Sequence, residues 1–292
     1  MKAKAKCPAS CGELLQGIIG KGEKLISYPI KLFSTVTIEE VKSPLRDDRR
    51  SKTALAMVET LKFFGEPYKI GERFEIQVKS EIPIGKGMAS STADVAAAAS
   101  ATAQLLGKKL TADELAKICV QVEPTDSTIF EKLTLFDHLK GIRIESFNWN
   151  PRLNILVLEA ESFIDTQEFR KQDHHALRLQ NQGQVEKAYQ HFRKAYENKD
   201  AVLLGEAAII SAWANQSILP KKKLEKIMEL SIRRGCYGVN VAHSGTVIGI
   251  IFEESKVEPD SLMEDFKKNR VFEDYTKAYF TEIVEGGVKI ID

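Results

Sequence analysis

The sequence predicts an α+β fold, in which strands and helices mix without the strict β-α-β alternation of a doubly wound sheet. A strand is indicated where Phe74, Ile76 and Val78 alternate with charged or polar neighbours, because successive side chains along a strand point to opposite faces. An alanine-rich helix is predicted shortly after it, over residues 91–106. A second helix beginning at Thr111 follows with no strand between the two, which argues against parallel β-α-β units.

Three further elements are predicted before that strand. The triplet at residues 20–22, Gly-Lys-Gly between two apolar runs, is typical of a hairpin turn. A helix is expected over residues 51–64, where Gly65 ends it. A half-buried strand is indicated by apolar residues at even spacing: Ile30, Leu32, Val36 and Ile38.

The two adjacent helices have recognisable ends. Gly107 is the expected C-terminal cap of the first, because glycine tolerates the left-handed backbone found there. Thr111, with Glu114 three residues later, forms a capping box at the start of the second, and Pro124 ends it. The apolar face of this second helix comprises Leu115, Ile118, Cys119 and Val122.

The second half of the chain shows shorter patterns. A strand is expected over residues 155–158, and two more over 237–241 and 246–252, on either side of a turn at Ser244-Gly245. Two amphipathic helices are indicated by apolar faces, one made of Val185, Ala188, Tyr189, Phe192, Ala195 and Tyr196 and the other of Leu224, Ile227 and Met228.

A domain boundary is predicted near residues 148–151, Asn-Trp-Asn-Pro, where the pattern changes. It divides the chain into an N-terminal domain of residues 1–150 and a C-terminal domain of residues 151–292. These lengths are ordinary for single domains.

Composition and charge exclude several function classes. Lys and Arg total 42 against 41 Asp and Glu, a formal net charge of +1, so neither nucleic acid nor a membrane is expected as a partner. The run of three lysines at residues 221–223 is interpreted as surface charge at the start of a solvated helix. No apolar stretch reaches the ~18 residues of a membrane span, and no hydrophobic segment follows the basic residues 1–6 as in a signal peptide. A cytoplasmic protein is therefore expected, and its oligomeric state stays open.

The cysteines and most histidines are interpreted as structural. The four cysteines form no dense framework, which fits a reducing compartment. Cys7 and Cys11 are spaced C-x3-C, but no second Cys/His pair follows at zinc-finger spacing. The Asp-His-His sequence at residues 173–175 is assigned to a surface helix or its flanking loop rather than to a metal site.

The most informative segment is the glycine-rich loop at residues 83–92, Pro-Ile-Gly-Lys-Gly-Met-Ala-Ser-Ser-Thr, between the clean strand and the alanine-rich helix. Glycines allow successive N–H groups to converge on one point, and the helix that follows adds free N–H groups and a positive dipole end. Together they predict a phosphate site. The predicted phosphate-binding residues are Gly85, Lys86, Gly87, Met88, Ala89, Ser90, Ser91, Thr92, Ser244 and Gly245.

Two better-known phosphate loops do not match this segment. A Walker A loop needs G-x-x-x-x-G-K-[ST], which is absent here. A dinucleotide fingerprint needs a third glycine where Ser90 stands, followed by a strand rather than a capped helix. The remaining alternative is a plain strand-to-helix turn, with the serines acting as caps.

Three segments in order resemble the motifs of the GHMP kinases, the superfamily of galactokinase, homoserine kinase and mevalonate kinase. Residues 83–92 are similar to its phosphate loop, P-x-x-x-G-x-[GA]-S-S. Residues 7–17, CPASCGELLQG, stand in the place of its first motif, and residues 238–246, GVNVAHSGT, resemble its third. The residues of these three segments are most similar to those of the L-threonine kinases of cobalamin biosynthesis.

The resemblance implies a GHMP kinase fold and two ligands. The fold would join an N-terminal domain like domain 2 of ribosomal protein S5 to a ferredoxin-like C-terminal domain, with the active site in the cleft between them. ATP and Mg²⁺ would be required, and residues 238–246 would border the phosphates.

Two carboxylates three residues apart, Glu123 and Asp126, follow the second predicted helix. Phosphoryl transfer commonly uses one carboxylate on Mg²⁺ and another as a base for the attacking hydroxyl. By resemblance, Glu123 with Ser91 would hold the metal and Asp126 would be the catalytic acid–base group. The alternative is that Asp126 only caps the next helix while Glu123 is exposed to solvent. The phosphate loop and the third motif favour the catalytic interpretation.

The substrate side is assigned to Ser10, Glu13 and His243. Asp94, in the first turn after the phosphate loop, is interpreted as structural. The expected reaction is phosphorylation of the hydroxyl of L-threonine by ATP, giving O-phospho-L-threonine for the aminopropanol phosphate arm of cobalamin. The alternatives are a kinase for another small alcohol, homoserine above all, and a catalytically inactive metabolite-binding regulator on the same fold.

Overall fold

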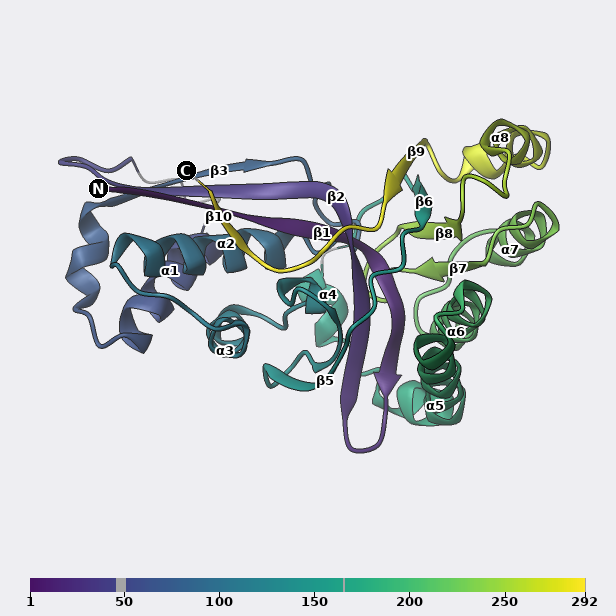
Figure 1. Cartoon of the computed structure of the whole chain (residues 1–292), viewed down its shortest axis with the longest axis horizontal. Helices are drawn as coiled ribbons and strands as arrows, with labels where there is room; N and C mark the ends of the chain where they lie inside the picture. Colours follow the sequence, from purple (N-terminus) through teal and green to yellow (C-terminus); the bar gives the residue numbers. More distant parts are fainter. Residues whose placement is uncertain (46–50, 165, 292) are drawn as a thin grey trace.

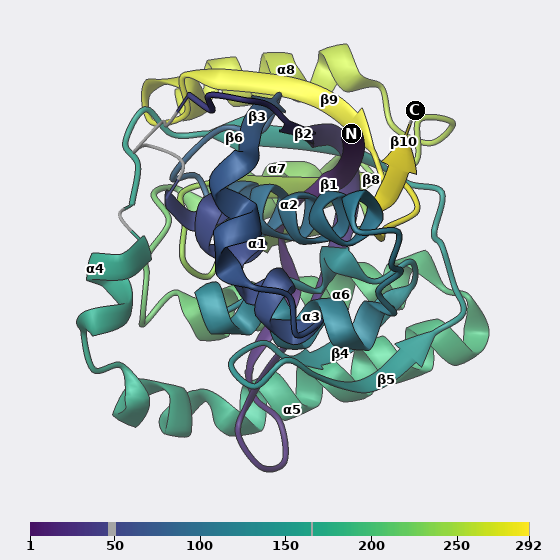
Figure 2. The ribbon, with the colours of Figure 1, turned by 90° about the vertical axis from the view of Figure 1, so that its left-hand side faces the viewer.

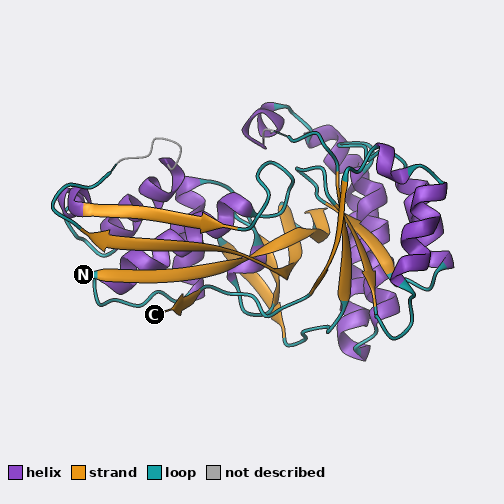
Figure 3. Ribbon diagram, turned by 90° about the horizontal axis from the view of Figure 1, so that it is seen from above, coloured by secondary structure: helices purple, strands orange, loops and turns teal. Residues whose placement is uncertain are grey.

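One ten-stranded sheet organises residues 1–45, 51–164 and 166–291, the part of the chain described by the computed structural model (Figures 1 and 3). Its strand order is β5-β4-β2-β1-β7-β8-β6-β9, with β3 beside β2 and β10 beside β1, and the paired strands run antiparallel. The strands are β1 (Lys2–Ile18), β2 (Glu23–Glu40), β3 (Phe74–Ser80), β4 (Leu133–Asp137), β5 (Ile142–Phe147), β6 (Asn154–Glu159), β7 (Gly238–Val241), β8 (Ile248–Phe252), β9 (Lys277–Glu282) and β10 (Lys289–Ile291).

Helices cover both ends of this sheet. Helices α1, α2 and α3 lie nearest the viewer in Figure 2, in front of β1 and β2, whereas α5 and α6 pack on β1 and β7 at the other end of the molecule. The helices are α1 (Ser51–Phe63), α2 (Ser90–Leu105), α3 (Ala112–Val122), α4 (Thr166–Lys171), α5 (His175–Asn198), α6 (Ala201–Asn215), α7 (Leu224–Arg233) and α8 (Pro259–Lys268), with short 3₁₀ helices η2 (Tyr68–Arg73), η3 (Ser127–Ile129) and η4 (Val271–Glu273). In the described part of the chain, none of the helices combines the length and apolar character that crossing a bilayer requires.

The long hairpin of β1 and β2 connects the two ends of the molecule (Figure 1). Near its start β1 pairs with β10, Lys4 lying opposite Ile291, and near its end Glu13 pairs with both Ser27 of β2 and Val241 of β7. The β1–β2 register shifts between Ser10 and Glu13, so the strand is irregular where the candidate substrate residues lie.

The alanines of α2 explain how closely this helix approaches the sheet. Six of them, Ala93, Ala96, Ala97, Ala98, Ala99 and Ala101, have no solvent exposure. Because a methyl side chain keeps the helix axis close to its neighbours, α2 packs on β1, β2 and α1. Its N-terminus is thereby fixed against the β1–β2 hairpin.

The α+β class and most of the predicted elements are confirmed. The predicted hairpin turn at 20–22 joins β1 to β2, and the helix predicted over 51–64 is α1. The capping box of α3 is present, with Thr111 accepting from the Glu114 N–H and Glu114 bonding back to the Thr111 N–H. The division at residue 150 stays a prediction, and β10, from the C-terminal half, lies on β1.

One interpretation of surface charge is wrong at its first residue. Lys221 is only 6% exposed, although Lys222 and Lys223 form ion pairs with Asp274 at the surface. The run precedes α7, but the side chain of its first lysine turns back to the loop after α6, where Nζ donates to the Leu219 carbonyl at 3.1 Å. Gln216 fixes that loop, since its side chain accepts from the Lys221 N–H at 2.8 Å and donates to the Lys221 carbonyl at 2.9 Å.

Candidate active site

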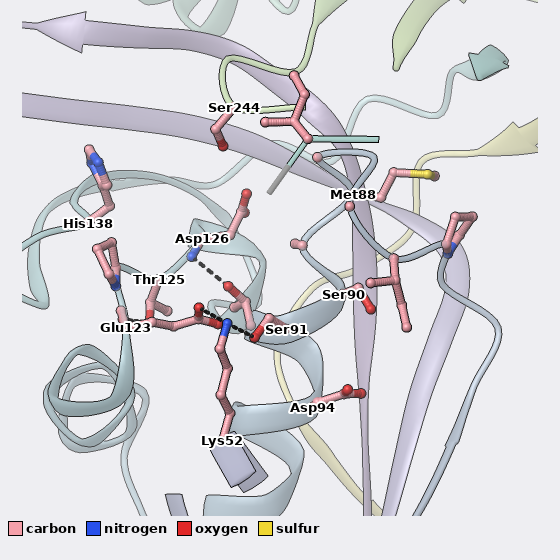
Figure 4. Close-up of a pocket in the computed structure, with 18 of the residues that line it drawn as sticks. Lys52, Met88, Ser90, Ser91, Asp94, Glu123, Thr125, Asp126, His138 and Ser244 are labelled. Carbon is pink, nitrogen blue, oxygen red and sulfur yellow. Dashed lines mark hydrogen bonds and ion pairs between the residues drawn. The ribbon is translucent and has the colours of Figure 1, made fainter. Parts of the chain in front are cut away.

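A cavity of about 460 Å³ opens beside the N-terminus of α2 (Figure 4). The sequence-predicted residues that line it are Glu13, Gly85, Gly87, Met88, Ala89, Ser90, Ser91, Thr92, Glu123, Asp126 and Ser244. These residues come from β1, the glycine-rich loop, the segment after α3 and the turn between β7 and β8. Segments far apart in sequence therefore converge on one site.

The glycine-rich loop has the backbone of an anion site. Gly85, Gly87 and Ala89 have φ angles of 72°, 81° and 57°, so left-handed residues alternate with ordinary ones up to the start of α2. Such alternation turns successive N–H groups toward one side of the chain. The left-handed conformation costs a non-glycine residue ~1–2 kcal/mol, so Ala89 is held there by its surroundings. The first residues of α2, Ser90, Ser91 and Thr92, line the same cavity, and the N–H groups of a first helical turn have no partner within the helix.

The turn between β7 and β8 packs directly on this loop. A Cβ on Gly87 would collide with the Ala242 side chain and lie 2.9 Å from the Gly245 Cα. The Lys86 carbonyl accepts from the N–H groups of Thr246 at 2.9 Å and Val247 at 3.1 Å. The two predicted phosphate segments therefore form one unit, and Ser244 lines the cavity at their junction.

The side chain of Lys86 lies away from the cavity. Its Nζ donates to the carbonyl oxygens of Ala160, Glu161 and Ser162 at 2.7, 2.9 and 2.7 Å. In this conformation the ammonium group fixes the loop after β6 rather than facing the predicted phosphates. Lys86 is also absent from the cavity wall, so its place in the phosphate-binding set stays a prediction. Gly245 likewise contributes by packing, because it is absent from the cavity wall.

Glu123, Ser91 and Lys52 form a polar cluster at the floor of the cavity (Figure 4). Lys52 Nζ lies 2.7 Å from Glu123 Oε2 and 3.1 Å from Ser91 Oγ. The Glu123 side chain is 11% exposed, which contradicts the alternative that placed it in solvent. Its second oxygen, Oε1, is buried and has no hydrogen-bond partner among the described residues. A buried carboxylate oxygen without a partner is costly, so this site is suited to a cation.

Asp126 is buried and held by several donors. Its Oδ2 accepts from Ser27 Oγ at 3.0 Å and from Ser10 Oγ at 3.5 Å. Its Oδ1 accepts from the Thr128 N–H at 3.1 Å, so Asp126 does cap the short helix η3, as the alternative expected. Burial, and next the charge of Glu13, raise its pKa to about 7. A carboxyl group that titrates near neutrality is suited to proton transfer.

Glu13 and His243 form a buried pair beside Asp126. Glu13 Oε2 accepts from the His243 N–H at 2.9 Å and lies 3.0 Å from His243 Nδ1. On the other side of the ring, Nε2 lies 3.2 Å from Ser211 Oγ of α6. Glu13 reaches the cavity wall, whereas His243 lies behind it and orients the carboxylate. Ser10 also lies behind the wall, where it is fully buried against Asp126.

Other residues singled out in the sequence have structural partners. Asp94 accepts a hydrogen bond from Ser34 Oγ, which ties α2 to β2, and it also lines the cavity. The four cysteines are free and buried. Among the described residues, no group of three or more His, Cys, Asp or Glu side chains could hold a metal ion.

Sequence reasoning missed several residues of the wall: Lys52, Gln16, His138 and Phe163. Lys52 stands in the first turn of α1, and only the packing of α1 on α2 and α3 brings it to Glu123. Phe163 is 72% exposed and packs beside Gly85. No local pattern distinguishes these positions from ordinary helix or loop residues.

Comparison with known proteins gives consistent results over nearly the whole chain. Residues 52–131 match the GHMP kinases N terminal domain, and residues 180–269 match the GHMP kinases C terminal domain. The chain is 38% identical to an L-threonine kinase of Citrobacter freundii over 99% of both sequences. It is 37% identical to an L-threonine kinase of Salmonella typhimurium over 99% of this chain and 95% of the relative.

The solved structures show the same fold at lower identity. A homoserine kinase from Cytophaga hutchinsonii superimposes with a TM-score of 0.70, covering 99% of this chain and 97% of the other at 15% identity. Identity at this level supports the fold alone.

Proposed function

Because the chain belongs to the GHMP kinases, we propose that it transfers the γ-phosphoryl group of ATP to the hydroxyl of L-threonine, giving ADP and O-phospho-L-threonine. The observation that carries this proposal is the 38% and 37% identity to two L-threonine kinases over 99% of the chain. The product would supply the aminopropanol phosphate arm of cobalamin. We place the enzyme in the cytoplasm, since its four free, buried thiols suit a reducing compartment.

The glycine-rich loop is the proposed site of the ATP phosphates. The left-handed residues Gly85, Gly87 and Ala89 turn backbone N–H groups toward the cavity, and the dipole of α2 adds a partial positive charge. Ser90 and Ser91 contribute hydroxyl groups to the same wall. At the mouth of the cavity, Ile84 and Phe163 are 83% and 72% exposed, and this apolar pair suits the adenine ring.

Ser91 and Glu123 are the proposed protein ligands of Mg²⁺. One carboxylate and one hydroxyl fit this ion, because Mg²⁺ in kinases takes its remaining ligands from phosphates and water. The unpartnered Glu123 Oε1 supports the assignment. Bound there, the ion would neutralise charge on the β- and γ-phosphates.

Asp126 is the proposed acceptor of the threonine hydroxyl proton. Ser27 and Ser10 hold its Oδ2, and its raised pKa suits a group that takes a proton in one step and returns it to water later. Asp126 lines the same cavity as Glu123 and Glu13, so it would bring the hydroxyl near both the phosphate loop and the substrate side. Glu13, oriented by His243, would accept hydrogen bonds from the substrate, with Ser10 supporting Asp126.

The test is ADP release by the purified protein with ATP and Mg²⁺, using L-threonine, L-homoserine, L-serine, mevalonate and galactose in parallel. Release that depends on L-threonine, with O-phosphothreonine identified by mass, is the expected result. Turnover of another alcohol alone would replace threonine while keeping the kinase. ATP binding without turnover of any alcohol would favour an inactive regulator.

A further inference from the structure

Lys221 is a buried lysine with few partners for its charge. Its Nζ donates to the carbonyl oxygen of Leu219 at 3.1 Å, and it forms no ion pair with the described residues. An ammonium group has three N–H bonds to place, so this side chain is left with unused donors. Burial lowers the pKa of Lys221 to about 7, while the charge of Glu13 acts in the opposite direction. The charge of Glu13 therefore offsets only part of the effect of burial on the Lys221 amine.

A second unused donor stands on the neighbouring helix. Asn215, at the end of α6, is 3% exposed, and its Nδ2 has no hydrogen-bond partner in the described structure. Ser211 lies four residues earlier, so both side chains project from the same face of α6. Ser211 Oγ accepts from the Gln16 N–H at 3.2 Å and contacts His243. This face of α6 is thus directed at β1 and at the Glu13–His243 pair.

Lys221 and Asn215 do not themselves line the cavity, and the connection to it runs through two residues of β1. Glu13 and Gln16 both line the cavity wall, and each is tied to the α6 side, Glu13 through His243 and Gln16 through Ser211. Glu13 also raises the pKa of Asp126 and that of Lys221, so its charge acts on both the proposed reacting group and the buried amine.

We infer that Lys221 and Asn215 form the subsite for the α-carboxylate of the amino-acid substrate, beside Glu13, which receives its α-ammonium group. In the described part of the chain, Lys221 has N–H bonds left without an acceptor, Asn215 Nδ2 has no acceptor, and the charge of Glu13 acts on the Lys221 amine. Unused donors and a carboxylate complement the opposite charges of a zwitterion. The inference rests on the proposed function and extends it to the substrate's charged groups.

The chemistry favours an anion over a neutral ligand. A buried ammonium group and a buried amide N–H lower the free energy of binding most when an anionic oxygen reaches both. A structural role would instead give Lys221 a carboxylate partner, as Lys222 and Lys223 have in Asp274. Because homoserine has the same two charged groups, this subsite selects amino acids as a class and leaves the position of the hydroxyl to other contacts.

The test compares L-threonine with 1-amino-2-propanol, which is threonine without its carboxylate. In Lys221→Met we expect the KM for L-threonine to rise about 30-fold or more, as for truncation of a buried charge partner, with little change for 1-amino-2-propanol. L-Threonine binding by calorimetry should weaken in parallel, while ATP affinity stays the same. Lys222→Met is the matched control, and it should leave both substrates unaffected.

Stability separates this role from a structural one. Removing an uncompensated buried charge should leave the Lys221→Met protein as stable as the parent or more so, whereas a structural lysine would give a lower Tm and weaker ATP binding. Asn215→Asp provides a second variant, because a carboxylate of nearly the same size should repel L-threonine more than 1-amino-2-propanol. If Lys221→Met fails to fold, Asn215→Asp alone tests the subsite.

The possible failures are distinguishable. If the parent enzyme does not phosphorylate L-threonine, the proposed function is overturned and the subsite with it. If the parent does so and both variants keep its preference for L-threonine over 1-amino-2-propanol, the subsite alone is overturned.

Discussion

The amine of Lys52 and the carboxylate of Glu123 lie 2.7 Å apart, and the same amine is 3.1 Å from Ser91 Oγ (Figure 4). Lys52 therefore contacts the same carboxylate and the same hydroxyl that are proposed to hold Mg²⁺, although it bonds Glu123 through Oε2 and leaves Oε1 without a partner in the described structure. Two cations on one carboxylate repel each other, so we expect the amine of Lys52 to oppose binding of the ion. The lysine therefore balances the charge of Glu123 in the protein without ligands.

Lys52→Met should strengthen metal binding in the absence of nucleotide. Removal of a half-exposed competing ion pair is worth ~0.5–1 kcal/mol, so the Kd for Mn²⁺, measured by electron paramagnetic resonance, should fall about two- to five-fold. Lys62→Met on the same helix is the control, because Lys62 pairs with Glu59 at the surface. If Lys52→Met binds Mn²⁺ with unchanged or weaker affinity, the amine of Lys52 does not compete with the metal ion for Glu123 and Ser91.

Asp126→Asn should separate catalysis from nucleotide binding. Loss of the proton acceptor is expected to lower kcat by about 10²–10⁴, while the ATP affinity, measured by calorimetry, stays within about two-fold of the parent. The asparagine oxygen can still accept from the Thr128 N–H, so the cap of η3 is kept. Unchanged turnover would remove Asp126 as the base, and loss of ATP binding would assign it a structural role.

The same substitution should raise stability at alkaline pH. The folded-state pKa of about 7 lies above the value of about 3.9 for an unfolded aspartate, so stability is lost as pH rises from about 4 to 7. Asp126→Asn removes that loss. The Tm of Asp126→Asn should therefore exceed that of the parent at pH 8 but not at pH 4. An equal difference in Tm at pH 4 and pH 8 would show that the protonation of Asp126 does not cause this loss of stability.

The pH dependence of kcat/KM for L-threonine should show an acidic limb near 7. Asp126 accepts a proton only when deprotonated, so the rate should rise with pH through that value. Glu13→Gln removes one of the two causes that raise this pKa, and the limb should move to lower pH even if the maximal rate falls. A limb that keeps its position in Glu13→Gln would show that another group titrates.

Gly87→Ala should damage the phosphate site. Its Cβ would collide with Ala242, and the loop would have to separate from Gly245. A displacement of about 1 Å should lower kcat/KM about 100-fold. Gly107→Ala is a matched control, since Gly107 has a similar φ of 69° but open space around it. It should lower stability by ~1–2 kcal/mol and leave kinetics unchanged. Equal kinetic losses in both variants would indicate a general backbone effect.

Local patterns were sufficient to predict part of this structure. The capping box at Thr111 and the alternation around Val78 depend on neighbours in sequence, and both elements lie where they were predicted. The glycine-rich loop was recognised for the same reason, because alternating left-handed positions need small residues at fixed spacing. The roles assigned to its residues stay predictions.

Long-range packing determined what the sequence could not reveal. Helix α6 is apolar along nearly its whole length, so no periodic face marks it, and its position follows from burial between α5 and the strands β1 and β7. Lys52 reaches Glu123 only because α1 packs on α2 and α3. In the sequence Lys221 looks like one of three surface lysines, but in the folded chain its side chain is buried.

The pairing of β1 with both β7 and β10 sets an order of events during synthesis. On a ribosome that adds about 5–20 residues per second, β1 appears roughly 15–60 s before β10, its partner at Lys4. Until β7 and β10 emerge, β1 can pair with β2 while its other edge stays open to water and to neighbouring chains. The strand that carries Ser10 and Glu13 is therefore made long before two of its three neighbours, β7 and β10.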